Sequence, residues 1–147
     1  MIITKTPLRV SFFGGGTDYP SWIKEHGGAV LSTSIDKYSY IQVLRLPPYF
    51  PHKTKVVWSH IEEVNDINEI VHPSVRETLR FLDFKDGVSV HYQGDVPARS
   101  GLGSSSAFTV GFLHALHGLS DNRPTQEQLA EDAIHIEQNC IKYYKAP

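Results

Sequence analysis

Residues 96–107 read VPARSGLGSSSA and lead from the end of an expected strand, through a glycine loop, into a helix that we expect over residues 104–117. Gly101 and Gly103 let the backbone fold closely around a ligand. The start of the helix offers N–H groups that have no partner inside the helix, together with the positive end of the helix dipole. This combination favours an anion such as phosphate.

Three hydroxyl side chains, those of Ser104, Ser105 and Ser106, stand at the start of this helix. They can donate to phosphate oxygens or, through a neutral oxygen, join the ligand shell of a hard cation such as Mg²⁺. A second interpretation is also open for this run alone. Serines cap helices and glycines form loops, so the segment could end a loop without binding anything.

Three better-known motifs do not fit the segment. A P-loop requires a lysine after its last glycine, where this chain has Ser104. A dinucleotide-binding fingerprint requires a glycine or an alanine at Ser106 and an acidic residue after the next strand, and we expect no such strand. A nucleophile elbow requires a glycine where this chain has Ala107.

A second candidate site lies near the amino terminus. Residues 7–20 read PLRVSFFGGGTDYP and place a cation on a strand and a carboxylate just past a glycine bend. Arg9 can contact phosphoryl oxygens or orient an acid, and Asp18 can accept hydrogen bonds from the hydroxyls of a sugar. The alternative, on this segment alone, is a surface arginine and an aspartate that caps a short helix.

Glu137 interrupts the apolar stripe of a helix that we expect over residues 125–139. A carboxylate on that stripe needs a partner, and a metal ion near the serines would supply one. If the helix is rotated slightly, Glu137 is instead solvated beside Lys142. Trp58 and Tyr49 could stack on a base, although we expect them to pack in the core or in a loop.

Strands come mostly first and helices mostly last, which predicts an α+β fold rather than an alternating parallel sheet. We expect residues 2–13 to form two short strands separated by Pro7. Residues 29–34 and 38–46 should pair as a hairpin with Asp36 in the turn. The other expected elements are a short helix around residues 22–26, a strand at 55–58, a helix that opens at 72–74 and a strand at 87–92.

The composition fits one ordinary domain with a core of its own. Of 147 residues, 40% are apolar and 20% are charged, and 14 basic against 16 acidic side chains give a net charge of −2. A nearly neutral chain without a cluster of Lys or Arg predicts neither nucleic acid nor membrane as a partner. The single cysteine, Cys140, excludes an internal disulfide and fits a cytoplasmic protein. Residues 1–5 lack the apolar stretch of a signal peptide.

Taken together, the two glycine-containing segments resemble the GHMP kinase superfamily, the group of galactokinase, homoserine kinase, mevalonate kinase and phosphomevalonate kinase. Residues 97–107 resemble the ATP-phosphate loop of the family, and residues 7–19 resemble its amino-terminal sugar-kinase motif. Within the family, residues 9–20 most resemble the bacterial D-glycero-D-manno-heptose 7-phosphate kinases, with fucokinase-like enzymes close behind. Galactokinases carry a Glu-His pair in place of Gly15 and Gly16.

The resemblance implies an amino-terminal ATP-binding domain over residues 1–147, with the fold of ribosomal protein S5 domain 2 and helices packed on one face of a mixed sheet. It also implies transfer of the γ-phosphate of ATP to a hydroxyl of a heptose 7-phosphate, with Mg²⁺ as the cofactor. By this resemblance, the ATP phosphates contact Gly101, Leu102, Gly103, Ser104, Ser105 and Ser106, Ser105 and Glu137 hold Mg²⁺, Arg9 lies near the transferred group as a catalytic residue, and the substrate contacts Gly15, Gly16, Thr17 and Asp18.

Members of the family are roughly twice as long as this chain, because a second domain follows the first. We therefore expect the carboxy-terminal GHMP domain, and with it the catalytic base, beyond residue 147. Surface that the second domain normally covers could then drive self-association. Two alternatives stay open: a catalytically inactive nucleotide-binding or scaffold module of the same fold, and a fucokinase-like sugar kinase.

Overall fold

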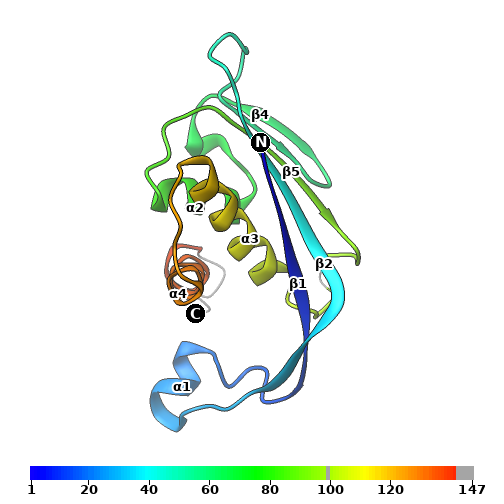
Figure 1. Ribbon diagram of the computed structural model, residues 1–147. Coiled ribbons are helices and arrows are strands. Elements are labelled where there is room, and N and C mark those ends of the chain that lie inside the picture. Colours follow the sequence, from blue (N-terminus) through cyan, green and yellow to red (C-terminus); the bar gives the residue numbers. More distant parts are fainter. Residues whose placement is uncertain (99, 142–147) are drawn as a thin grey trace.

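The computed structural model describes residues 1–98 and 100–141, and its helices α2, α3 and α4 lie on the same side of a five-stranded sheet (Figure 1). In chain order the elements are β1 (Ile2–Phe13), α1 (Pro20–His26), β2 (Leu31–Arg45), β3 (Thr54–Val57), β4 (Ile61–Val64), the 3₁₀ helix η1 (Ile67–Glu69), α2 (Pro73–Phe81), β5 (Val88–Gly94), α3 (Ser104–Leu119), α4 (Gln126–His135) and the π-helix η2 (Ile136–Cys140). The strand order is β1-β2-β5-β3-β4. Since β3 runs parallel to β5 and the other pairs are antiparallel, the α+β fold with a mixed sheet is confirmed.

The core lies between the sheet and α3. Ile41 and Val43 of β2 and Val90 of β5 are fully buried, because alternate residues of a strand point to the same face. Phe112 and Leu116 of α3 pack against this face. Each fully buried side chain of this size contributes about 1.5–3 kcal/mol, so the packing fixes α3 firmly on the sheet.

A close contact between the backbone of α3 and the strand β1 sets the position of α3 along the sheet. A Cβ atom at Gly111 would lie 2.7 Å from Oγ1 of Thr6 and 3.2 Å from Oγ1 of Thr4, so only a glycine fits here. The buried hydroxyl of Thr4 donates to the carbonyl of Gly111 at 2.9 Å. The first turn of α3 is thereby held beside the middle of β1, where Arg9 lies.

Two expectations about the first strands were wrong. Residues 2–13 form one strand, because β1 is at the edge of the sheet and an edge strand tolerates the missing N–H of Pro7. The expected hairpin with a turn at Asp36 is absent among the described residues, since β2 runs unbroken from Leu31 to Arg45. The pairing passes from Pro7 opposite Tyr38 to Arg9 opposite Ser34, so residues 35–37 form a bulge instead of a turn.

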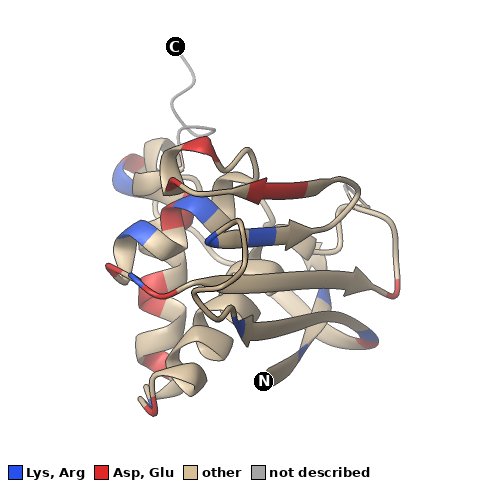
Figure 2. Cartoon of the chain, turned by 90° about the horizontal axis from the view of Figure 1, so that it is seen from above, with Lys and Arg blue, Asp and Glu red and all other residues tan. Residues whose placement is uncertain are grey.

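Basic and acidic positions are interspersed over the described chain (Figure 2). Lys55 of β3, for example, pairs with Glu63 of the neighbouring β4 at 2.6 Å. Among the described residues, none of the helices combines the length and the apolar character needed to cross a bilayer.

Candidate active site

The glycine loop, residues 101–103, leads into α3, and its backbone has a conformation that favours glycine. Gly101 and Gly103 both have a φ of 76°, and Gly103 is the residue that precedes the first turn of α3. No side chain among the described residues caps this end of the helix. The first N–H groups of α3 are therefore left to solvent or to a ligand, as an anion site requires.

Arg9 ties β1 to the glycine loop. Its backbone N–H donates to the carbonyl of Leu102 at 3.0 Å. Its side chain lies along Gly103, where an added Cβ would be 3.1 Å from Cγ and 3.4 Å from Nε of the arginine. The guanidinium group is thus held next to the loop, and it brings a fixed positive charge to the proposed anion site.

A hydroxyl–carboxylate cluster joins the start of α3 to the π-helix η2. Ser105 Oγ donates to one carboxylate oxygen of Glu137 at 2.9 Å, and Ser106 Oγ donates to the other at 2.8 Å. The hydroxyl of Thr109, on a fully buried residue, lies 3.2 Å from Oε1 of Glu137 and also 3.2 Å from the carbonyl of Ser105. The hydroxyl–carboxylate cluster consists of these four residues.

Glu137 reaches α3 because the last helix changes its winding. The sequence predicts an α-helix over residues 125–139, but α4 ends at His135 and the five following residues form the π-helix η2. The N–H of Ile141 donates to the carbonyl of Ile136 at 2.9 Å, and both side chains are buried. The wider turn leaves Glu137 half-buried and turned toward the serines, and π-helical turns are frequent at functional sites.

The glycine bend at residues 14–16 is closed by backbone contacts. A Cβ at Gly14 would lie 1.8 Å from the carbonyl oxygen of Ala29, so a larger residue does not fit. The hydroxyl of Thr17 donates to the carbonyl of Gly14 at 2.9 Å. The carboxylate of Asp18 accepts from the N–H of Gly16 at 2.9 Å and is otherwise exposed.

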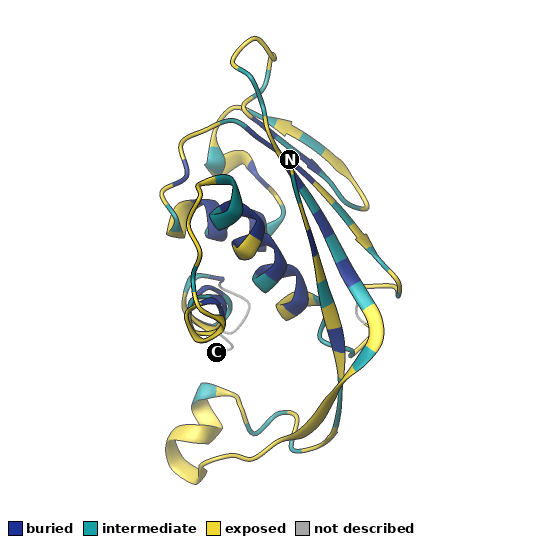
Figure 3. Cartoon of the chain, viewed as in Figure 1, coloured by how far each residue is buried: buried dark blue, intermediate teal, exposed yellow. Residues whose placement is uncertain are grey.

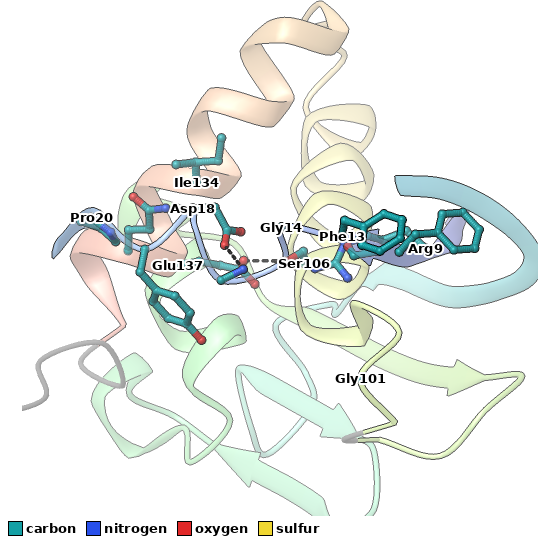
Figure 4. A pocket seen from close by; sticks show the side chains of 15 residues that line it. Arg9, Phe13, Gly14, Asp18, Pro20, Gly101, Ser106, Ile134 and Glu137 are labelled. Carbon is teal, nitrogen blue, oxygen red and sulfur yellow. Dashed lines mark hydrogen bonds between the residues drawn. The ribbon is translucent and has the colours of Figure 1, made fainter. Parts of the chain in front are cut away.

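A pocket of about 590 Å³ joins these two segments (Figure 4). In Figure 4, the contact between Ser106 and Glu137 lies between Asp18 and Arg9. The predicted site residues that line this pocket are Arg9, Gly15, Gly16, Asp18, Gly101, Ser106 and Glu137. Residues that were selected from three separate parts of the sequence therefore meet in one pocket.

A second pocket, of about 480 Å³, opens on the other side of the first turn of α3, and Ser104, Ser105 and Glu137 form one of its edges. Four ring-bearing side chains form part of its wall, those of Trp58, His72, Tyr92 and Phe108, and we call it the aromatic pocket. The ring centroids of His72 and Phe108 are 4.6 Å apart, and those of Tyr92 and Phe108 are 5.4 Å apart. Burial lowers the pKa of His72 and raises that of Tyr92, so both rings favour their neutral forms.

The donor set of the hydroxyl–carboxylate cluster suits a hard cation. It offers one carboxylate and neutral hydroxyl oxygens, and Mg²⁺ prefers oxygen ligands. The described residues contain no group of three or more His, Cys, Asp or Glu side chains that could hold a metal. A cation with one or two protein ligands, which fills its shell with water and phosphate oxygens, fits this arrangement.

Comparison with known proteins assigns these features to a family. The model for the N-terminal domain of GHMP kinases matches residues 68–145, more than half of the chain and the part that holds the glycine loop and Glu137. The chain belongs to the GHMP kinase family. A GHMP kinase domain is what the resemblance of both glycine-containing segments predicts, so that prediction is confirmed.

Named relatives of this GHMP kinase domain act on sugars. It is 27% identical to D-glycero-alpha-D-manno-heptose 7-phosphate kinase of Campylobacter jejuni over 95% of this chain and 44% of that protein. It is 26% identical to a bifunctional fucokinase/GDP-fucose pyrophosphorylase of Arabidopsis thaliana, over 90% of this chain and 14% of that protein. The chain thus spans less than half the length of the curated relatives that it matches.

A solved structure shares the fold of this GHMP kinase domain. It is a D-glycero-D-manno-heptose 1-phosphate kinase from Bacteroides thetaiotaomicron, with a TM-score of 0.79 and 20% identity, and the match covers 95% of this chain and 49% of that one. The comparison confirms the expected fold class.

Sequence reasoning missed two parts of the site. Thr109 follows Ser105 by four residues, so the spacing on one face of the helix was a usable signal. The aromatic pocket combines Trp58, a residue that we expected in the core or in a loop, with rings from three other segments, and no local pattern indicates such a combination.

Proposed function

We propose that this GHMP kinase domain is the nucleotide-binding half of an ATP-dependent sugar-phosphate kinase that acts on a heptose 7-phosphate. One observation carries the proposal: the hydroxyl–carboxylate cluster lies at the uncapped start of α3, with one pocket on each side. Phosphoryl transfer needs a donor and an acceptor on either side of the transferred group. In this proposal, one pocket holds the phosphoryl donor and the other holds the acceptor.

In this proposal, the donor nucleotide lies on the side of the aromatic pocket. The triphosphate contacts the N–H groups that follow Gly103 and the hydroxyls of the three serines, since dipole and hydrogen bonds favour anions there. The base enters the aromatic pocket, where its flat faces can stack on rings. Trp58 and His72 are the rings that we assign to the base.

Ser105 and Glu137 would hold Mg²⁺ in the proposed complex. The ion supplies neutralisation of the phosphate charge. Ser105 must then turn its hydroxyl proton away from Glu137, so that both residues offer an oxygen. Thr109 can keep its hydrogen bond to the carboxylate and hold it in place.

The acceptor sugar would lie in the larger pocket. The exposed carboxylate of Asp18 accepts from sugar hydroxyls, and Gly15, Gly16 and Thr17 form the bend beside it. Arg9 lies by the glycine loop, where its charge stabilises the phosphoryl group during transfer. The acceptor hydroxyl loses its proton as it attacks the γ-phosphorus, and we assign the base that takes this proton to the second domain.

A coupled assay of ADP release, with ATP and D-glycero-D-manno-heptose 7-phosphate, tests the proposal. The assay compares this chain with a chain that includes a second GHMP domain. We expect turnover in the longer chain, and Mg-ATP binding in both. A longer chain that binds Mg-ATP but releases no ADP with any sugar would support an inactive module of the same fold.

A fucokinase-like activity is the second candidate, and the match to the Arabidopsis thaliana protein favours it. The same assay with free L-fucose separates the two substrates. Turnover with fucose, and none with heptose 7-phosphate, would move the assignment to the fucokinase-like group.

A further inference from the structure

Glu62 of β4 accepts hydrogen bonds from three N–H groups that come from two segments. The indole N–H of Trp58 donates to Oε1 at 2.9 Å, the N–H of Val71 donates to Oε2 at 2.6 Å, and the N–H of His72 donates to Oε1 at 3.2 Å. The carboxylate therefore joins the turn between β3 and β4 to the segment that precedes α2. Hydrogen bonds to a charged acceptor are the stronger kind, so this junction is firmly held.

Both ring-bearing residues that Glu62 holds are walls of the aromatic pocket. The rings of Trp58 and His72 meet edge to face at 4.9 Å, and His72 in turn packs against Phe108 of α3. The Nδ1 atom of His72 accepts from the N–H of Val75 at 3.4 Å and so caps α2. A residue that fixes the indole and the backbone of His72 at once fixes the shape of this pocket.

The neighbouring Glu63 shows what an ordinary surface carboxylate does on the same strand. Successive residues of a strand point to opposite faces, so Glu63 is exposed on the other side and pairs with Lys55 at 2.6 Å. A surface pair of this kind contributes little to stability. Glu62, by contrast, is half-buried on the side of the helices.

We infer that Glu62 is a positioning residue that orients Trp58 and His72 for the base of the nucleotide. The inference rests on the proposed function, because it assigns the aromatic pocket to the base. Glu62 touches neither the glycine loop nor the hydroxyl–carboxylate cluster through any of its three hydrogen bonds in the described structure. Its loss should weaken contacts with the base and leave contacts with the phosphates intact.

The test compares Glu62→Gln with Glu63→Gln, which removes the same charge from the same short strand. In Glu62→Gln, the amide NH₂ group must face one of the N–H donors, so at least one hydrogen bond is lost. The ligands are Mg-ATP, adenosine and Mg-tripolyphosphate, and the dissociation constants are measured by calorimetry. For Glu62→Gln we expect about tenfold weaker binding of ATP and adenosine, because rings that are less well ordered before binding lose more freedom on binding, with tripolyphosphate unchanged. Glu63→Gln should bind all three ligands like the wild type.

Three results would overturn the inference: equal behaviour of both variants, an equal loss for ATP and tripolyphosphate in Glu62→Gln, or wild-type affinities throughout. If Glu62→Gln does not fold, Glu62→Asp decides, because it keeps the charge but is one CH₂ group shorter, so its carboxylate no longer reaches all three N–H donors. The same selective loss for ATP and adenosine is expected there, and no loss would contradict the inference. A wild-type chain that binds neither ATP nor tripolyphosphate would show that the proposed function itself is wrong.

Discussion

The start of α3 and the amino-terminal arm, which we define as residues 12–31, face the same pocket but are built in different ways. Eight residues of α3 are buried, whereas α1 of the arm has none (Figure 3). Phe13 and Trp22 of the arm are 74% and 49% exposed. The proposed phosphate side of the pocket is thus anchored by a helix that packs in the core, while the proposed sugar side is held by a two-stranded ribbon and a few turn hydrogen bonds.

This difference in burial predicts how α3 and the amino-terminal arm should respond to substitutions. Substitutions near α3 should alter both stability and nucleotide binding, because the same side chains serve both. Substitutions in the arm should alter sugar binding alone. The exposed apolar residues of the arm are also the surface that we expect a second domain, or a second copy of this chain, to cover.

Glu137→Gln should give the largest effect among single changes to the hydroxyl–carboxylate cluster. The amide keeps the size of the side chain but loses the charge that a cation needs. We expect Mg-ATP to bind about a hundredfold more weakly, and ATP in excess EDTA to bind as it does to the wild type. Calorimetry with both solutions measures this, and Glu131→Gln, on the exposed face of α4, is the control. An equal loss with and without Mg²⁺ would argue against a metal site.

Thr109→Val should act on stability and on binding together. The change keeps the shape and removes the buried hydroxyl that lies 3.2 Å from Glu137. We expect a loss of about 1 kcal/mol in the free energy of unfolding, and Mg-ATP should bind about tenfold more weakly.

Thr78→Val is the matched control for Thr109→Val, because no partner is found for the buried Thr78 hydroxyl among the described residues. It should be neutral or slightly stabilising, since removing an unpaired buried hydroxyl removes a desolvation penalty. Urea unfolding of both variants decides. Equal losses in the two would mean that the hydroxyl of Thr109 does not act through Glu137.

His72 should make stability depend on pH in the acid range. Burial lowers its pKa in the native state, so the unfolded chain binds the proton first, near pH 6.5. Its contribution is fully present above that pH and is lost as the pH falls toward the lower native pKa. The free energy of unfolding should therefore be lower at pH 5.5 than at pH 7.5, as measured by urea unfolding.

His72→Asn provides the reference, because asparagine also caps helices and does not titrate here. The difference in unfolding free energy between wild type and His72→Asn should therefore shrink or change sign at acid pH. A difference that stays constant from pH 7.5 to 5.5 would contradict the assignment to His72.

Asp18→Asn should have the smallest effect on the fold and on the nucleotide. The amide oxygen can still accept from the N–H of Gly16, so the bend should keep its shape. We expect an unchanged melting temperature and unchanged Mg-ATP affinity. In a chain with both domains, the KM for the sugar phosphate should rise about tenfold, because one charged acceptor is lost. A comparable loss of nucleotide affinity would show that the arm and α3 are not separate in function.

The sequence predicts what depends on neighbouring residues. The glycines with left-handed backbone and the serines at the start of α3 belong to short local patterns. The sequence does not decide whether Glu137 approaches the serines or is solvated, because its position depends on the π-helical turn and on the packing of Ile136. The role of Glu62 has no local signal at all, since its donors come from other segments.

The unbroken strand β2 is a case in which a local sequence pattern led to a wrong prediction. Asp36 and Lys37 favour a turn in isolation, but β1 offers a partner on both sides of them, and the polar pair is accommodated in a bulge. Tertiary pairing thus overrides the local preference.

The central claim, that the glycine loop and the start of α3 bind the triphosphate of ATP, is tested most directly by calorimetric titration of Gly103→Val and Gly27→Val with Mg-ATP. Both glycines have a positive φ, of 76° and 67°, so a valine is strained at either position. Only the side chain at residue 103 enters the site, where it meets Arg9. We predict that Gly103→Val remains folded and loses Mg-ATP binding, while Gly27→Val, in the arm, binds Mg-ATP like the wild type. Wild-type affinity in a folded Gly103→Val would contradict the claim.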